Sequence, residues 1–335
     1  AEEQQIWQQS PQLALNLPAV NRLLPENFDV KPMVTQSKPE IILQQDGISA
    51  WLYPSQAFAS QPRGVLEIFF NTGAPQQDIK ARVLLALWHD LFNLQQSALA
   101  TEADIAGMQL RLTAGSGMAL TIAGFTDKQP QLLQQALAGL SVSVQEQSFA
   151  QAKDRYIRGL QNQGKQFPFY QAFGAFNNLI RNGNYETDQL IDAANSLTNT
   201  DLQAFIQHTL SNNQLRIFAF GNYDKATVSQ VLSELKQALP ADRTELPYQR
   251  SAYWKPAAGQ TLVVQKDIDV ADVALVDVHV HPEPSYSQLA RATILKSHFS
   301  NVAFDKLRTE EQLAYAVGGT AMQLEDYVGF AMYIQ

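Results

Sequence analysis

The chain has 335 residues, of which 45% are hydrophobic and 17% charged, a balance typical of a globular protein with room for two domains. A formal net charge of -8 argues against nucleic acid and anionic membranes as partners. No apolar run reaches the roughly 18 residues of a membrane span, and the absence of cysteine excludes disulfides and thiolate zinc sites.

The first part of the chain predicts a connector followed by strands and a helix. Residues 1–34 carry closely spaced prolines, which favour an extended connector. Residues 48–54 and 64–73 are rich in β-branched and aromatic residues and predict strands. The Leu- and Ala-rich run 81–92 is too long for a strand and predicts a buried helix, and residues 107–125 alternate around Gly-Ser-Gly as a hairpin does.

Further helices are predicted from capping boxes and from the spacing of apolar residues. Ser148 with Gln151 predicts one helix start, and Thr200 with Gln203 predicts another. A strand is expected at 215–224. The helix faces are marked by Leu133, Leu137 and Leu140, by Phe149, Ala152, Tyr156 and Leu160, and by Val228, Val231, Leu232 and Leu235.

The order of these elements predicts the fold class and the domains. Strands and helices come in runs and do not alternate, which favours an α+β fold with a mostly antiparallel sheet and helices packed on one face. Prolines and weak periodicity mark a linker at 241–260. We therefore expect a connector at 1–34, one domain at 35–240 and the start of a second domain at 261–335.

The sequence repeats itself at one constant offset. VLEIFFNTG at residue 65 aligns with VALVDVHVH at 273, the helix at 81 with LARATILKSHF at 289, and LATEADIAGM at 99 with LRTEEQLAYA at 307. This pattern predicts tandem homologous domains, although chance matching of two common patterns is the alternative. About 110 residues of the second copy are then expected beyond Gln335, and the last strand, 327–335, is expected to have an unpaired edge.

Comparison of the two copies distinguishes a predicted helix cap, which both copies carry, from two residues that only the second copy carries. Thr309 with Gln312 has the spacing of a helix cap, and Thr101 with Asp104 is expected to play the same part in the first copy. Arg308 aligns with Ala100, and Tyr315 aligns with Gly107. The second copy thus places a guanidinium and a phenol where the first has neither, which makes these two residues the candidate site.

LRTEEQLAYAV, together with LPAVNRLLPENF at 17–28, resembles the pitrilysin/insulinase family of zinc metallopeptidases, the inverzincins. The resemblance implies the LuxS/mitochondrial-processing-peptidase-like metallohydrolase fold, with four homologous domains in two halves around a peptide-sized chamber. This chain would supply the third domain and the start of the fourth. Arg308 and Tyr315 would face the zinc across the chamber and hold the substrate backbone; a surface Arg and a half-buried core Tyr are the plain alternative.

The function that the resemblance implies is that of a zinc-dependent endopeptidase degrading peptides and small proteins in the periplasm of a Gram-negative bacterium. Zinc would be bound by the N-terminal catalytic half of the same polypeptide, and none is expected in this chain, which alone would be inactive. The partners would be peptide or small protein substrates and that catalytic half, with no nucleic acid and no membrane. The alternative is a non-catalytic structural or peptide-binding subunit of the same fold.

Two histidine-containing stretches were candidates for a metal site. His89 stands where the family carries H-x-x-E-H, but Phe92 and Asn93 replace the general base and the second ligand, so a non-catalytic copy is expected. Asp277, His279 and His281 alternate along one predicted strand and are weak metal candidates. A polar strand face is the favoured interpretation, because a three-ligand site normally draws on more than one element.

Overall fold

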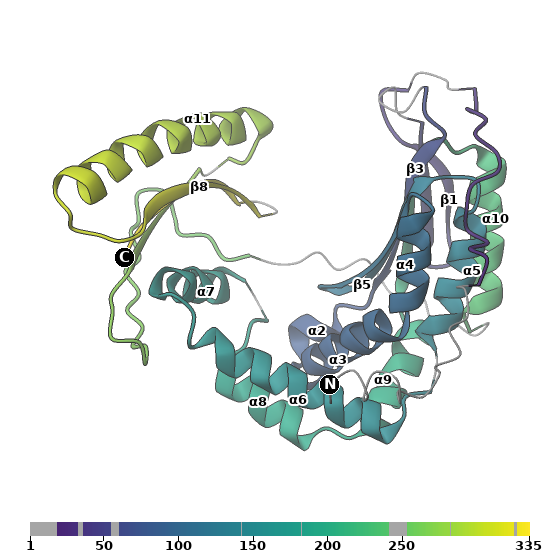
Figure 1. Ribbon diagram of the computed structural model, residues 1–335, viewed down its shortest axis with the longest axis horizontal. Coiled ribbons are helices and arrows are strands. Elements are labelled where there is room, and N and C mark those ends of the chain that lie inside the picture. The colour runs from purple at the N-terminus through teal and green to yellow at the C-terminus, as the bar shows by residue number, and fades with distance from the viewer. Residues whose placement is uncertain are drawn as a thin grey trace, which may run out of the picture.

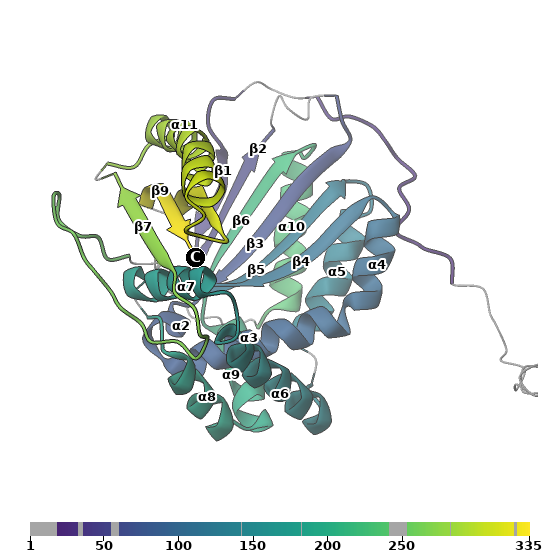
Figure 2. The same cartoon turned by 60° about the vertical axis from the view of Figure 1, so that its left-hand side comes forward.

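The computed structural model describes residues 19–32, 36–54, 60–141, 143–181, 183–240, 253–281, 283–324 and 327–335. They form a first unit around a six-stranded sheet and a second unit around a three-stranded sheet. Figure 1 shows the two sheets on opposite sides of a curved arrangement, linked through helices at its base, and Figure 2 shows the strands of the first sheet side by side.

The sheet of the first unit has the strand order β1-β2-β6-β3-β5-β4, and every neighbouring pair is antiparallel except β2 with β6. Leu66, Ile68 and Phe70 alternate along β3 and are buried against the helices. The strands are β1 Glu40–Gln45, β2 Ile48–Tyr53, β3 Arg63–Asn71, β4 Met108–Ala114, β5 Gly117–Phe125 and β6 Gln214–Gly221.

Helices of the first unit cover one face of this sheet and extend from its end, as Figure 1 shows for α4, α5 and α10. The predicted α+β class is therefore confirmed. Within the described residues, no helix is both long and apolar enough to cross a membrane. The helices are α2 Ala74–Gln77, α3 Ile79–Gln95, α4 Ser97–Ile105, α5 Gln129–Leu140, α6 Glu146–Gln163, α7 Pro168–Ile180, α8 Thr187–Ser196, α9 Asn199–Ser211 and α10 Lys225–Ala238.

The second unit repeats part of the first. Its strand order β7-β9-β8 matches β3-β5-β4, and a helix again lies between its first strand and its hairpin. The predicted repeat of strand and helix is confirmed by this shared topology, and the structure extends it to the hairpin. The elements are β7 Leu275–Val280, α11 Tyr286–Ala303, the π-helical segment η2 Phe304–Glu310, β8 Val317–Leu324 and β9 Tyr327–Ile334.

The constant offset of the repeat is wrong by one residue in the first strand. It aligns Phe70 with Val278, whereas the structure makes His279 the counterpart of Phe70. A Cβ on Gly117 would lie 1.9 Å from the carbonyl oxygen of Phe70, and a Cβ on Gly329 would lie 1.9 Å from that of His279. Side chains alternate between the two faces of a strand, so an alignment error of one residue assigns each side chain of β7 to the wrong face.

The predicted helix caps are also wrong. Helix α6 begins at Glu146, before Ser148, and α9 is capped by Thr198 and Asp201, whose side chains each bond the other's backbone N–H. The Thr198 hydroxyl and backbone N–H both donate to the Asp201 carboxylate, and these two bonds lower the pKa of Asp201.

Thr101 and Thr309 lie inside helical segments and do not cap them. The Thr101 hydroxyl donates to the Ser97 carbonyl at 2.9 Å within α4, and Thr309 lies within η2. Strand β9 pairs on both sides, with β7 and β8, so the unpaired edge expected there is wrong as well. The prediction did not include β1, α7 or α8.

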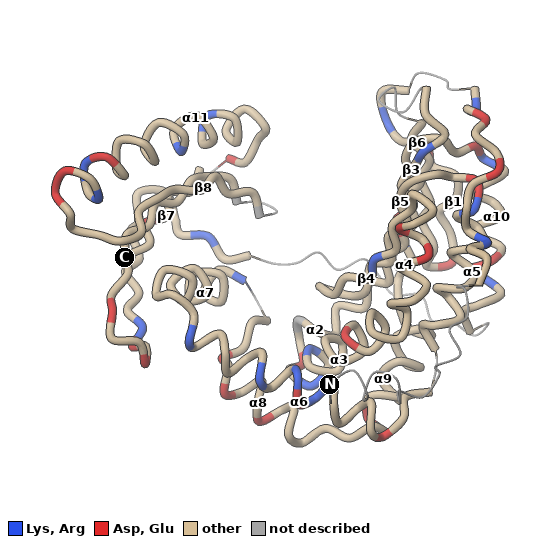
Figure 3. Tube along the Cα trace, in the orientation of Figure 1, with Lys and Arg blue, Asp and Glu red and all other residues tan. Residues whose placement is uncertain are grey.

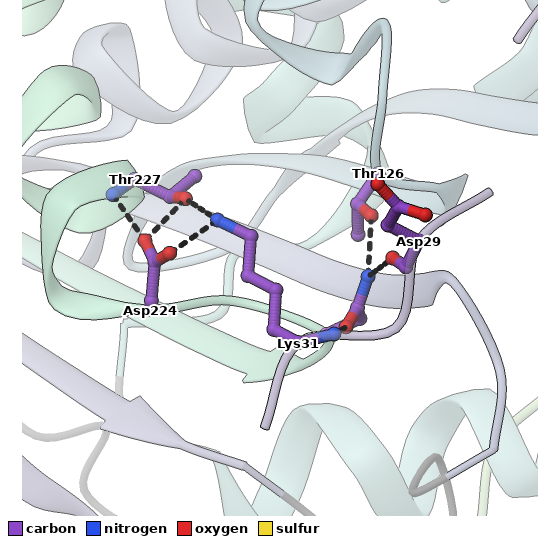
Figure 4. A network of polar contacts seen from close by, with 6 residues as sticks. Asp29, Lys31, Thr126, Asp224 and Thr227 are labelled. Atoms are coloured by element: carbon purple, nitrogen blue, oxygen red, sulfur yellow. Dashed lines mark hydrogen bonds and ion pairs between the residues drawn. The ribbon is translucent and has the colours of Figure 1, made fainter. Parts of the chain in front are cut away.

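The connector is fastened to the first unit along its described residues, 19–32. Leu23 is buried in the core, and the Lys31 backbone N–H donates to Asn222 Oδ1 at 2.7 Å. The Lys31 ammonium lies 2.5 Å from Asp224 Oδ2 and 2.7 Å from Thr227 Oγ1 (Figure 4). Proline-rich extended backbone is thus held by specific polar contacts, which the sequence did not predict.

Helix α7 links the two units. The Phe169 ring stacks on Tyr333 of β9 with centroids 4.6 Å apart, and the Phe169 backbone N–H donates to Gln335 Oε1 at 3.2 Å. The Phe330 ring of β9, whose side chain lies on the other face of the strand, stacks on Phe299 of α11. The second sheet therefore lies between α7 and α11, as Figure 1 shows.

Candidate functional site

The two candidate residues lie on either side of the chain reversal that follows η2. Arg308 is in η2, and Tyr315 is in the segment that leads to β8. Gln312 has a φ of 51°, which is uncommon for a residue other than glycine. The reversal is closed by a hydrogen bond of 2.8 Å from the Leu313 N–H to the Leu307 carbonyl. The turn brings together two side chains that are seven positions apart in sequence.

The Arg308 guanidinium contacts two aromatic rings. Its central carbon lies 5.2 Å from the centroid of Tyr315 and 5.0 Å from that of Phe304, within the range of a cation–π contact. No hydrogen bond joins its N–H donors to another described residue, so these donors stay available. Tyr315 is 74% exposed and Arg308 is also exposed, so both are accessible to another molecule.

The acidic residues beside this pair are bound to a different cation. Lys306 lies 3.0 Å from Glu310 and 3.3 Å from Glu311, contacts that raise the pKa of Lys306. Figure 3 shows these charges gathered where α11 passes into η2. Within the part of the chain that the structure describes, no carboxylate forms an ion pair with Arg308. Arg308 can therefore bind an acceptor from outside the chain.

The geometry around His89 does not fit a metal site. Its Nε2 lies 2.8 Å from the Leu112 carbonyl oxygen. The amide of Asn93 lies 2.9 Å from the same nitrogen, and Phe92 is buried in the core. His89 is thus held by partners within the chain, and position 92 carries an apolar side chain.

Asp277, His279 and His281 do not converge on one point. His279 Nε2 lies 3.0 Å from Asp277 Oδ2 and its ring stacks on Phe330. His281 lies beyond the end of β7, where its Nδ1 contacts the backbone of Glu283. Among the residues described, no group of three His, Asp or Glu side chains could hold a metal ion.

Two family models match the chain. The model described as the middle or third domain of peptidase M16 matches residues 1–193, and the one described as the peptidase M16 inactive domain matches residues 196–335. The chain belongs to the peptidase M16 family. The resemblance to the pitrilysin/insulinase family is therefore confirmed.

Relatives and solved structures agree with this assignment. The chain is 25% identical to Protease 3 of Shigella flexneri and of Escherichia coli K12 over 333 residues, 98% of the chain and 34% of the relative. Identity to the insulin-degrading enzyme of Homo sapiens is 24%, over 95% of the chain and 32% of that protein. The chain spans about a third of the length of these relatives.

The solved structures show the fold. The crystal structure of pitrilysin matches with a TM-score of 0.81 at 24% identity, over 96% of this chain and 34% of that one. The peptidase M16 inactive domain from Pseudomonas fluorescens matches with a TM-score of 0.63 at 14% identity, over 89% and 74%.

Phe304 is a contact of the candidate site that sequence reasoning missed. It lies four residues before Arg308, a spacing that places two side chains on one helical face. This spacing was the available signal. No signal in the sequence indicated the π-helical winding of the segment that carries both residues.

Proposed function

We propose that this chain is the C-terminal portion of a zinc-dependent endopeptidase that degrades peptides and small proteins in the periplasm. Residues 35–240 would be the third of four domains, 241–260 a linker and 261–335 the start of the fourth. Zinc would be bound by the N-terminal catalytic half, because the residues around His89 and His279 do not fit it. The substrates would be peptides enclosed between the two halves.

In this proposal Arg308 and Tyr315 hold the substrate. The supporting observation is their contact at 5.2 Å in an exposed position, with the guanidinium edge and the phenol both open to an acceptor. A guanidinium and a phenol O–H both donate to carbonyl oxygens, and such donors stabilise negative charge that develops during peptide hydrolysis. The rings of Phe304 and Tyr315 orient the guanidinium before substrate binds.

The test uses the complete two-half enzyme and a quenched fluorescent peptide. Arg308→Ala and Tyr315→Phe are each expected to lower kcat/KM by about tenfold or more, because one donor of this kind typically contributes about 10²–10³ in rate. Arg291→Ala and Tyr286→Phe are matched controls on exposed positions of α11 and should leave kcat/KM unchanged. Unchanged kinetics in the first pair, with zinc content and folding intact, would remove the assigned role.

A non-catalytic structural or peptide-binding subunit is the second candidate function. It is favoured by the description of the matching C-terminal model as an inactive domain. A mixing experiment separates the two proposals. Peptide cleavage by the zinc-loaded upstream half that requires addition of the C-terminal half supports the peptidase. A folded, zinc-containing complex that binds peptide without cleaving it supports the subunit.

A further inference from the structure

A cavity of about 520 Å³ lies in the first unit, between α3, α6, the end of β4 and the segment that joins α7 to α8. Figure 1 shows these helices at the base of the curved arrangement, away from α11 and β8. The volume falls within the range of about 300–1,000 Å³ typical of small-ligand sites. None of the described residues that line the cavity carries a carboxylate, and its polar lining includes Arg82, His89, Tyr156, Asn178, Asn184 and Tyr185.

Arg82 is the cation of this cavity. Its one hydrogen bond to a described residue is a long contact of 3.5 Å from Nη1 to the Gly115 carbonyl, and no described carboxylate pairs with it. The neighbouring acid Asp78 accepts from the Lys80 N–H, where it caps α3. By contrast, Arg155 on α6 binds Asp90 at 2.6 Å. Arg82 thus keeps most of its five donors for a ligand.

Two tyrosines add neutral donors beside Arg82. Burial raises the pKa of both Tyr156 and Tyr185, and the charge of Asp78 raises that of Tyr185 further. The charge of Arg82 partly offsets both shifts, so both phenols carry their proton at neutral pH. Neither hydroxyl bonds another described residue. Both side chains line the cavity, so their hydroxyls can donate to an acceptor within it.

Two asparagines supply a donor and an acceptor side by side. Asn184 Nδ2 donates to the Asn177 carbonyl at 3.1 Å and to Asn178 Oδ1 at 3.3 Å. These bonds leave Asn184 Oδ1 and Asn178 Nδ2 available, the pair of groups that a peptide unit requires. Leu85, Leu160 and Leu190 supply apolar wall.

We propose that this cavity binds a carboxylate carried on a short peptide segment. Arg82 and the two phenols would bind the carboxylate, and the Asn178–Asn184 pair would bind the adjoining peptide unit. One guanidinium among neutral donors matches a group of single negative charge, whereas a phosphate normally requires more positive charge. The inference goes beyond the proposed peptidase role and does not depend on Arg308 or Tyr315.

Isothermal titration calorimetry on the 335-residue chain at pH 7 tests this site. The probes are acetyl-Gly-Gly-Leu with a free C-terminal carboxylate, the same peptide as its C-terminal amide, acetyl-Gly-Asp-Gly-amide and inorganic phosphate. We expect one of the carboxylate peptides to bind about tenfold or more tightly than the uncharged amide. The two carboxylate probes distinguish a C-terminal from a side-chain source of the same chemistry.

Arg82→Gln should abolish the preference for the carboxylate, whereas Arg158→Gln, which removes an exposed arginine of α6 outside the cavity, should leave it intact. Tyr185→Phe, a milder change, should weaken carboxylate binding about threefold to tenfold. Circular dichroism establishes that each variant is folded. Equal affinity for acid and amide, no binding of any peptide, tighter binding of phosphate, or equal losses in the two arginine variants would each overturn the proposal.

Discussion

The two units share a strand order but differ in what covers the first strand of each. Strand β3 lies between β6 and β5, and its Leu66, Ile68 and Phe70 are at most 2% exposed. Within the described chain, β7 pairs with β9 alone, and α11 packs on β8 and β9. At the corresponding positions Leu275 is 63% exposed, and the side chains of Asp277 and His279 are 62% and 58% exposed.

This difference shows that the features that set the strand order are not the ones that bury the strands in a core. Gly117 and Gly329 meet the neighbouring backbone in the same way, so close strand approach is common to both units. Burial of the first strand is not common to both units, because it depends on the helices and strands that the first unit adds. Polar side chains at Asp277 and His279 accompany the open face, which agrees with the interpretation of these residues as a polar strand face.

The largest expected effect comes from truncating the two corresponding side chains. Phe70→Ala removes a fully buried ring and should lower the free energy of unfolding by about 3–5 kcal/mol. His279→Ala, at the matching position of β7, should change it by less than about 0.5 kcal/mol. Urea denaturation followed by circular dichroism measures both. Similar losses in the two variants would mean that β7 is buried after all.

A methyl group at the shared glycines should affect both units alike. Gly117→Ala and Gly329→Ala each place a Cβ 1.9 Å from a carbonyl oxygen, so each should destabilise its own hairpin by about 1–3 kcal/mol. Hydrogen exchange of the amides in β5 and β9 reports the two sites separately.

Gly159→Ala on α6 is the control for the glycine variants. Nothing lies within 4 Å of its added Cβ, and alanine is favoured over glycine inside a helix, so no loss is expected. A Gly329→Ala variant that exchanges at the rate of the parent chain would break the equivalence of the two hairpins.

The sequence predicted those parts of the molecule whose contacts are local. Alternation along β3 and β5 and the apolar spacing of α3 and α10 point to a core formed by the same segments. Helix α7 was missed because its aromatic residues pack on the other unit: the partner of Phe169 is Tyr333, far along the chain. No pattern within α7 records that contact.

The same distinction applies to the candidate sites. The repeat marked Arg308 and Tyr315, but their contact depends on a positive φ at Gln312, for which glutamine gives no sequence signal. The Arg82 cavity joins α3, α6 and the segment before α8, so it emerges only once these elements are packed. Sequence patterns identified residue types, and tertiary structure decided which of them meet.

The smallest expected effect concerns the ion pairs of the two units. Asp224 is partly buried, which opposes ionisation, but bonds from Lys31 and Thr227 prevail and hold its pKa at about 2, below its ordinary 3.8. A carboxylate with a depressed pKa stabilises the fold above its unfolded pKa, and this stability is lost as the pH falls from about 4 through about 2. Because its side chain is 47% exposed, Asp224→Asn should cost about 1 kcal/mol at pH 7.

The pH dependence of that cost separates charge from packing. In urea denaturation the curves for the parent chain and Asp224→Asn should draw together as the pH falls to about 2 and meet below it, because the parent carboxylate becomes protonated over this range. Glu310→Gln in the second unit is the matched control: its pair with Lys306 is exposed, so the urea midpoint should not move at any pH. A cost of Asp224→Asn that persists unchanged at pH 2 would assign it to packing of the connector and not to the charge of Asp224.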